Sequence, residues 1–262
     1  QALSRTSPDL TYAPLAWETR PDPGWGRDYD FPEVVERERR DREVFIQRLR
    51  SGSPLSVDPG GPGSDQSAMV EEHNEHMTYG YALALAARQK QSLKVLDYGG
   101  SMGDRYWLAR LLLPNIGLEY HCKELPATAE QGRRLSPEVL WHTDDACLEQ
   151  GYDLVMLSSS LQYIKDWQTL LARAAAAAHA YLFLAGIATV QRVPTYPALL
   201  RLHGAMMPYW QFNRDELLHV VRTTELTLFR EFVMGNHMHV LNAPEQPSYR
   251  GWLFRRNSEA LR

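Results

Sequence analysis

The sequence lacks the features that mark several large classes of protein. It holds 2 cysteines in 262 residues, too few for a disulfide framework or a cysteine-rich zinc site. No apolar stretch approaches the length of a membrane span, and no secretory signal opens the sequence. We therefore expect a soluble, cytoplasmic protein with no membrane span.

An excess of charge of one sign is also missing. The chain has 28 basic against 32 acidic residues, a net charge of −4. A nucleic-acid-binding protein usually carries a basic excess or a basic stripe, so we expect no nucleic-acid partner. The length suffices for one large domain, or for one domain with a sizeable appendage.

The composition divides the chain into two parts. Residues 1–67 are expected to form an N-terminal arm, a helix and a flexible loop, ahead of a main domain at 68–262. Tryptophans in the arm can pack it on the domain, and the mixed charge of residues 31–50 predicts one helix with a solvated face. The Gly/Pro-rich stretch 51–67 fits a lid and a plain connector equally well.

Strand and helix patterns alternate through the main domain, which predicts a parallel sheet with helices on both faces. The expected strands are 94–97, 118–125, 139–143, 153–157 and 181–185, and the expected helices are 68–91, 105–113 and 167–178. Asn213, followed three residues later by Glu216, predicts the start of a further helix. Two strand-like runs, 226–234 and 250–254, come last and can pair as an antiparallel hairpin.

A glycine-rich turn at the end of the first expected strand is the most informative motif. The apolar run ends in Asp97, and Gly99, Gly100 and Gly103 lead into a helix. Glycines let a backbone approach a ligand closely. The free N–H groups of a helix start favour a carboxylate or a phosphate. The turn therefore predicts a site for a nucleotide-like cofactor.

The spacing within this turn separates three classes of cofactor site. The dinucleotide fingerprint G-x-G-x-x-G fits poorly, because two adjacent glycines open the turn here. A phosphate-binding P-loop is excluded, since Asp104 follows Gly103 where lysine is needed. The pattern Asp-x-Gly-x-(Gly/Ser)-x-Gly does fit, with Ser101 at the middle small position. A glycine-rich turn without any ligand is the remaining alternative.

Residues at the ends of the next strands are further candidates, because ligands of open parallel sheets lie beyond the carboxyl ends of the strands. Glu124, followed by Leu125, ends the second strand, and its carboxylate can accept hydrogen bonds from two vicinal ribose hydroxyls. Asp144 and Asp145 follow the third strand, and the sequence does not decide between them. Adjacent residues of an extended chain point in opposite directions, which disfavours a paired-carboxylate or metal site there.

Small polar residues follow the fourth expected strand. Ser158 and Ser159 are expected to line the cofactor, and Gln162 and Tyr163 the acceptor side. A serine nucleophile would need a Gly-x-Ser-x-Gly elbow or a partnered base, and neither is evident.

Residues 186–212 are expected to be an insertion on the substrate side. They contain Arg192, Tyr209 and Trp210, and aromatic rings with polar neighbours suit a carbohydrate; an ordinary hydrophobic cover fits equally well.

Three histidines are candidates for a general base, since neutral histidine near pH 7 suits that task. His237 and His239 share one side of an extended segment, and His203 is a reserve candidate. Each of the paired imidazoles is equally compatible with a surface or core position.

The chain from about Met69 to Arg256 resembles the class I S-adenosyl-L-methionine (SAM) methyltransferases. Three stretches carry the resemblance: Val-Leu-Asp-Tyr-Gly-Gly-Ser-Met-Gly with Tyr106, then Lys-Glu-Leu-Pro, then Leu-Ser-Ser-Ser-Leu-Gln-Tyr-Ile-Lys-Asp-Trp. More narrowly, they are similar to a bacterial family associated with the synthesis of surface or storage polysaccharides. Serine at position 101, where the wider class has glycine, is a mild departure.

The resemblance implies an α/β, Rossmann-like fold with a mostly parallel seven-stranded sheet and an antiparallel C-terminal hairpin. It implies that the glycine turn wraps the methionine part and the ribose of SAM, and that Glu124 is the ribose-binding acid. Asp144 or Asp145 would accept from the adenine amino group. A helix before the sheet closes over the cofactor in related enzymes, which makes Tyr79 and Tyr81 candidates for its carboxylate end.

The implied activity is methyl transfer from SAM to a hydroxyl of a sugar or oligosaccharide, with S-adenosyl-L-homocysteine (SAH) as the product. The sugar rests on family association alone. A natural-product or other small-molecule acceptor, a non-catalytic partner subunit of the same fold and a nicotinamide oxidoreductase are the alternatives. The sequence requires no metal, although magnesium is compatible with it, and a monomer and a homodimer fit equally.

Overall fold

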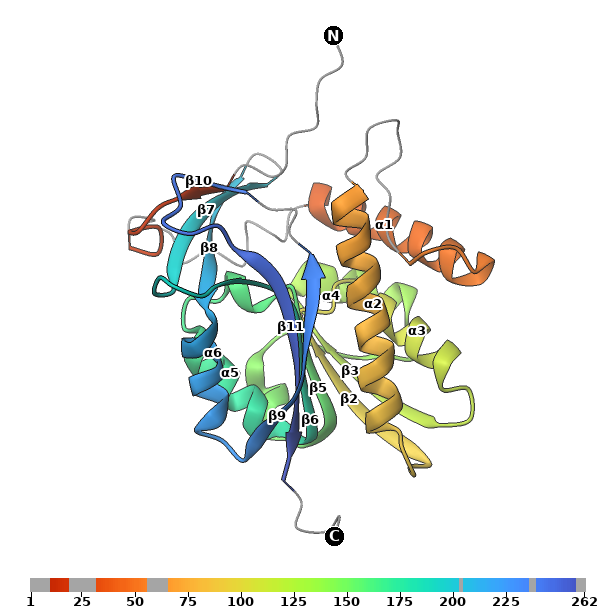
Figure 1. The fold of residues 1–262 in the computed structure, drawn as a ribbon. Coiled ribbons are helices and arrows are strands. Elements are labelled where there is room, and N and C mark those ends of the chain that lie inside the picture. The colour runs from red at the N-terminus through yellow and green to blue at the C-terminus, as the bar shows by residue number, and fades with distance from the viewer. Residues whose placement is uncertain (1–9, 19–31, 56–65, 203–204, 236–238, 258–262) are drawn as a thin grey trace.

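The protein forms a mixed β-sheet with helices packed on both faces (Figure 1). The structure is a computed structural model, and it describes residues 10–18, 32–55, 66–202, 205–235 and 239–257.

Five parallel strands form the centre of the sheet, in the order β4-β3-β2-β5-β6. Their bounds are β2 (Ser92–Tyr98), β3 (Gly117–Lys123), β4 (Leu140–His142), β5 (Tyr152–Ser158) and β6 (Ala178–Val190). β2 and β5 are buried along most of their length, as expected of strands covered on both faces. The parallel sheet predicted from the alternating pattern is confirmed.

The predicted C-terminal hairpin is also present. β9 (Leu226–Gly235) pairs antiparallel with β11 (Ser248–Arg256), and β11 in turn pairs antiparallel with β6. This part of the sheet therefore runs β4-β3-β2-β5-β6-β11-β9, seven strands in which β11 alone runs opposite to its two neighbours.

Two groups of helices cover the sheet. α2 (Gln66–Ala86) and α3 (Asp104–Leu112) pack on one face, and α5 (Trp167–Ala177) and α6 (Arg214–Arg222) pack on the other (Figure 1). Asn213 caps α6 as predicted, because its side chain accepts from the N–H groups of Asp215 and Glu216. The remaining helical elements are α1 (Pro32–Ser51), α4 (Pro126–Leu135), η1 (Asp145–Glu149) and η2 (Leu161–Tyr163).

Four further strands extend the sheet beyond the end of β6, and the sequence did not predict them. β8 (Ala205–Asn213) runs parallel to the last residues of β6 and pairs antiparallel with β7 (Tyr196–Leu202). β1 (Leu10–Tyr12) pairs with β7, and β10 (Val240–Leu241) pairs with β1. The expected insertion at 186–212 is thus mostly strand. Pro197 and Pro208 lie within β7 and β8, and proline lowers the expectation of a strand.

Some boundaries also differ from the sequence prediction. α2 ends at Ala86 rather than near residue 91, and Gln89 beyond it adopts a positive φ of 60° that a helix cannot continue. β6 spans 13 residues, well beyond the predicted 181–185, because it carries both the central sheet and the junction to β8.

Candidate functional site

A cavity of about 460 Å³ lies beyond the carboxyl ends of β2, β3 and β5, where an open parallel sheet usually binds its ligand. The N-terminal segment, α1, the turn after β2 and β8 also contribute to its wall. The lining residues are Trp17, Glu38, Tyr98, Gly99, Ser101, Arg105, Lys123, Glu124, Leu125, Ser158, Ser159, Ser160, Tyr163, Ile164, Lys165, Met207 and Pro208.

The glycine turn after β2 is built so that only glycine fits at two of its positions. Gly99 has a φ of 76°, and a Cβ there would lie 2.4 Å from the Cβ of Ser160. A Cβ on Gly100 would lie 2.6 Å from both the Asp97 carboxylate and the Cys122 sulfur. Ser101 also adopts a positive φ, 53°, which is uncommon outside glycine. The turn therefore brings bare backbone to the cavity wall.

Glu124 is held firmly at the end of β3. Its Oε1 accepts from the Ser101 N–H at 3.2 Å, and its Oε2 accepts from the Leu125 N–H at 2.6 Å. Burial raises the pKa of Glu124, while the two backbone N–H groups act in the opposite direction. The result is an acceptor group in the cavity wall, fixed by backbone on both sides.

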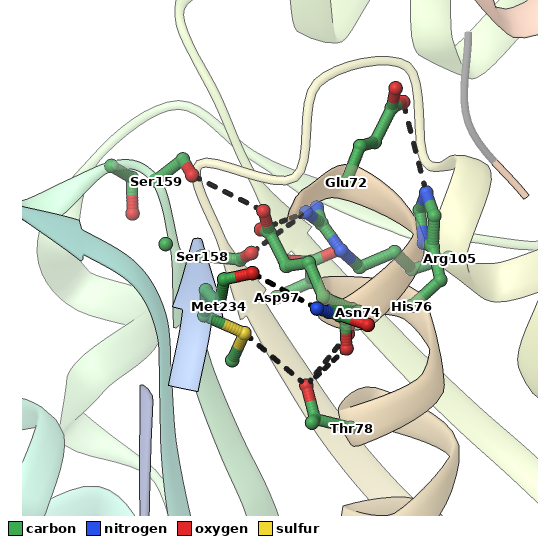
Figure 2. A network of polar contacts seen from close by, with 12 residues as sticks. Glu72, Asn74, His76, Thr78, Asp97, Arg105, Ser158, Ser159 and Met234 are labelled. Atoms are coloured by element: carbon green, nitrogen blue, oxygen red, sulfur yellow. Dashed lines mark hydrogen bonds and ion pairs between the residues drawn. The ribbon is translucent and has the colours of Figure 1, made fainter. Parts of the chain in front are cut away.

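Arg105, two residues after the last glycine of the turn, joins the cavity to a polar network beneath it (Figure 2). Its Nη2 donates to Glu75 Oε1 at 2.9 Å and to Ser158 Oγ at 2.8 Å. Burial raises the pKa of Glu75, and Arg105 opposes this. Arg105 Nε is buried and has no hydrogen-bond partner among the residues that the structure describes. The guanidinium therefore retains an unused donor beside the cavity.

Asp97 lies below the turn rather than in the cavity wall. Its Oδ2 accepts from the Tyr120 hydroxyl at 2.9 Å, and its Oδ1 has no hydrogen-bond partner in the described part of the chain. Burial raises the pKa of Asp97, and the positive charge of Arg105 opposes that rise. Its position supports the turn from beneath.

A further carboxyl group enters the cavity from α1. The Ser101 hydroxyl donates to Glu38 Oε2 at 3.1 Å. Burial, followed by the neighbouring Glu124 carboxylate, raises the pKa of Glu38 to about 8.

Several of the residues that line the cavity are apolar or aromatic. Trp17, Met207 and Pro208 are buried residues in its wall, and Tyr163 and Ile164 complete it. Trp17 stacks on Trp210 with a centroid distance of 5.4 Å, and Trp210 Nε1 donates to the Ile164 carbonyl at 3.0 Å. The N-terminal segment is thus tied to β8 and to the end of η2.

The structure brings many of the sequence-predicted residues together. Those that line the cavity are Gly99, Ser101, Glu124, Leu125, Ser158, Ser159 and Tyr163. Gly100 and Gly103 lie in the same turn, and Gly103 is the N-cap of α3. Gln162 and Tyr209 lie behind the wall: Gln162 Nε2 donates to the Gly186 carbonyl and to the Tyr209 hydroxyl.

Other candidates lie outside the cavity wall. Arg192 has a side chain 85% exposed, beside Glu245. Tyr79 is buried with its hydroxyl near that of Tyr120, and Tyr81 is exposed beside Phe232. After β4, Asp144 caps η1 by accepting from the Ala146 N–H. Its neighbour Asp145 accepts at 2.7 Å from the hydroxyl of Tyr98, a cavity residue.

Of the three histidines, only His239 belongs to the described residues. Its side chain is exposed just ahead of β10 and does not line the cavity. His203 and His237 lie outside the described residues, as does most of the expected lid at 51–67.

Within the part of the chain that the structure describes, no group of three His, Cys, Asp or Glu side chains is placed to hold a metal ion. Nor is any helix there long and apolar enough to cross a membrane.

Several cavity residues escaped sequence reasoning. Arg105 could have been found, because it follows the glycine turn closely and begins the same helix. Glu38 gave no signal, since it is one of many charged residues in α1. Trp17 was predicted to pack the arm on the domain, but nothing local predicts that it reaches the cavity.

No model of a known protein family matches this sequence, and no curated protein matches it. Solved structures do match the fold. Magnesium protoporphyrin IX methyltransferase from Synechocystis PCC 6803, with SAM bound, aligns with a TM-score of 0.52 and 12% identity over 84% of this chain and 97% of that one. The N-terminal domain of EvdMO1, with SAH bound, aligns with a TM-score of 0.51 and 14% identity over 83% of this chain and 98% of that one. The predicted Rossmann-like class I methyltransferase fold is therefore confirmed.

Proposed function

We propose that this protein is a SAM-dependent O-methyltransferase whose acceptor is a hydroxyl group of a sugar or oligosaccharide. The position of Glu124 is the main observation in favour of SAM as the cofactor. Its carboxylate is held in the cavity wall next to the glycine turn, where it can accept from both hydroxyls of a ribose. The fold supports the proposal, since structures of this fold hold SAM or SAH.

The polar atoms of the cavity fit the remaining parts of this cofactor. Arg105 Nε is a buried donor for which the described residues offer no acceptor, and it suits a carboxylate such as that of the methionine part. At Gly99 the turn has no side chain, so a ligand can approach its backbone closely. We propose that Glu124, Arg105 and the turn hold the two ends of SAM.

The chain's own share of the reaction is positioning. When bound, SAM supplies a methyl group activated by a positively charged sulfonium. Ser158 ends β5 in the cavity wall, and its hydroxyl accepts from Arg105. Because serine is small, this strand end leaves room for the acceptor. Trp17 and Tyr163 offer rings that can pack on a sugar face. Holding an acceptor oxygen in line with the reacting methyl supplies a large part of the rate.

An acceptor hydroxyl reacts faster when a base draws off its proton. We propose His237 or His239 for this role, with His203 in reserve, on the sequence argument alone.

The apolar wall favours a second acceptor class. Ile164, Met207 and Pro208 offer carbon surface rather than hydroxyl partners. A natural product with an apolar ring system would bury that surface, and it is the second candidate for the acceptor.

Two measurements test the proposal. Calorimetry with SAH should show binding to the wild type, a strong loss in Glu124→Ala, and no change in Glu130→Ala, a control at an exposed glutamate of α4. Wild-type protein without affinity for SAH or SAM would contradict the cofactor assignment. Incubation with labelled SAM and a panel of sugars, oligosaccharides and apolar natural products, followed by mass spectrometry, would identify the acceptor class by the gain of one methyl group.

A further inference from the structure

Two carboxyl groups from distant parts of the chain meet at Ser101. The Ser101 hydroxyl donates to Glu38 Oε2 at 3.1 Å, and its N–H donates to Glu124 Oε1 at 3.2 Å. Both glutamates line the cavity. A site that binds a ribose through Glu124 therefore has a second carboxyl group beside it, contributed by α1.

The position of Glu38 is fixed by its own helix. Arg42, one turn later, donates through Nη2 to the Leu135 carbonyl and to Ser136 Oγ, both at 3.2 Å. Phe45 is buried and packs on His76 of α2 at a centroid distance of 4.8 Å. Residues 38, 42 and 45 share one face of α1 because they are three and four positions apart. The contacts of Arg42 and Phe45 therefore fix the helix face that carries Glu38 into the cavity wall.

Within the described ranges, no cation forms an ion pair with Glu38. On the outer face of α1, by contrast, Arg39 pairs with Glu36 and Glu43. Among the described residues no donor reaches its second oxygen, Oε1. Glu124, Asp104 and Asp41, all acidic, add to burial in raising the pKa of Glu38. Such an arrangement costs stability in the free protein, and functional sites commonly carry that kind of cost.

We propose that Glu38 is a second binding group for the ribose of the cofactor, facing Glu124 across the two vicinal hydroxyls, so that α1 forms one wall of the cofactor site. This inference rests on the proposed function. Each ribose hydroxyl is one donor and an acceptor. Glu124 accepts from the two hydroxyl groups, which uses both of their protons, and Glu38 in its protonated form donates to a hydroxyl oxygen.

The test is a titration of two ligands into matched variants of the full chain. The ligands are SAH and its 2′,3′-dideoxy analogue, which lacks both hydroxyls. Glu38→Met removes both oxygens and keeps side-chain length and helix propensity. Glu43→Met is the control on the exposed face of the same helix. Calorimetry measures the affinities, and thermal melts confirm that each variant is folded.

We expect Glu38→Met to bind SAH roughly three- to tenfold more weakly than the wild type, the value of one hydrogen bond. The two proteins should bind the dideoxy analogue equally, and Glu43→Met should match the wild type with both ligands. Glu38→Gln, which keeps the shape and a hydrogen-bonding group, should recover part of the loss.

Equal affinity of Glu38→Met and wild type for SAH would overturn the inference while leaving the proposed function intact. An equal loss for both ligands would overturn it as well, because it would reveal a role in shaping the cavity rather than in contacting the hydroxyls. A wild type that binds neither SAH nor SAM would remove the proposed function, and this inference with it.

Discussion

Arg105 and Glu75 form a buried ion pair beside the cavity, with Arg105 Nη2 2.9 Å from Glu75 Oε1 and side chains only 14% and 10% exposed. The same nitrogen donates to Ser158 Oγ at the end of β5 (Figure 2). One guanidinium thus joins α2, α3 and β5. The edge of the sheet that lines the cavity is held by charge as well as by packing.

Breaking this ion pair should be costly. Glu75→Ala removes the carboxylate that is hydrogen-bonded to Arg105 and leaves Asp97 as its acidic neighbour. We therefore expect the free energy of unfolding to fall by about 3 kcal/mol, the lower end of the range for a broken buried ion pair. Urea unfolding measures the change. The matched control is Glu130→Ala, which breaks the exposed pair with Arg134 and should cost less than about 1 kcal/mol. Similar losses in both variants would show that the buried pair contributes no more to the free energy of unfolding than the exposed pair.

Replacing Gly99 of the glycine turn with alanine should destabilise the protein more than replacing Gly52, a glycine outside the turn with nearly the same backbone conformation. Gly52 and Gly99 have φ of 72° and 76°, but a Cβ on Gly52 meets open space. Gly52→Ala should cost about 1–2 kcal/mol, the conformational penalty alone. Gly99→Ala adds a clash with Ser160, so it should destabilise the chain further and lower SAH affinity. Equal effects in urea unfolding and calorimetry would refute the close approach.

Glu38 predicts how stability depends on pH. Its pKa is raised from the ordinary 4.5 to about 8 in the folded chain. Between these values the folded protein keeps a proton that the unfolded chain releases, so stability falls as pH rises. Burial also raises the pKa of Asp104 to about 7, which acts in the same direction.

Glu38→Gln should remove part of this loss. Melting curves of the variant and the ligand-free wild type should coincide near pH 5 and separate toward pH 8. We take the loss of folding free energy from ionising Glu38 as about 1 kcal/mol, since solvent screens a partly exposed carboxylate. The variant should then melt higher by about 2–4 °C at pH 8. Glu43→Gln is the control. A constant difference at every pH would exclude titration of Glu38 as the cause.

Replacing Trp17 should weaken acceptor binding without weakening cofactor binding. Trp17 lines the cavity and stacks on Trp210 of β8, whereas Glu124 is held by backbone N–H groups at the end of β3. We expect Trp17→Ala to raise the KM for the acceptor several-fold and to leave SAH affinity unchanged. Steady-state kinetics and calorimetry measure the two effects, with Leu15→Ala at a neighbouring exposed residue as the control. A loss confined to SAH affinity would assign Trp17 to the cofactor instead.

The histidine hypothesis predicts a change in turnover without a matching change in affinity. Alanine at His203, His237 or His239 should lower kcat for the residue that acts as base and leave SAH binding intact. Single-turnover rates measured across a range of pH would identify the base, because the variant that lacks it should lose the rise in rate that accompanies its deprotonation. Unchanged turnover in all three variants would exclude a histidine base.

The sequence predicted well where a function depends on residues that are neighbours along the chain. The strand ending in Asp97, the glycine turn and the start of α3 form a continuous motif, and Gly99 has no alternative there because of its positive φ and its contact with Ser160. The ends of parallel strands meet at one edge of a sheet, so Glu124 and Ser158 could be brought together from the alternating pattern alone.

The sequence was less informative where the cavity draws on segments far from these strands. Nothing local distinguishes Glu38 from the other glutamates of α1. Its neighbours in space, Ser101 and Glu124, are distant in sequence, and Glu38 reaches them only because Arg42 and Phe45 pack α1 on the rest of the protein. Gln162 illustrates the opposite case. It closely follows Ser158 and Ser159, which line the cavity, but its amide nitrogen donates inside the protein to the Gly186 carbonyl and the Tyr209 hydroxyl.

By itself, the sequence determined the parallel sheet, the antiparallel hairpin and the turn at which a ligand can approach the backbone, because strand periodicity and glycine conformation are local properties. Only the tertiary structure decided that β1, β7, β8 and β10 extend the sheet, and that α1 and Trp17 close the cavity from two sides. Those contacts join residues that are distant in sequence, and their energy comes from burial and charge that no short segment contains.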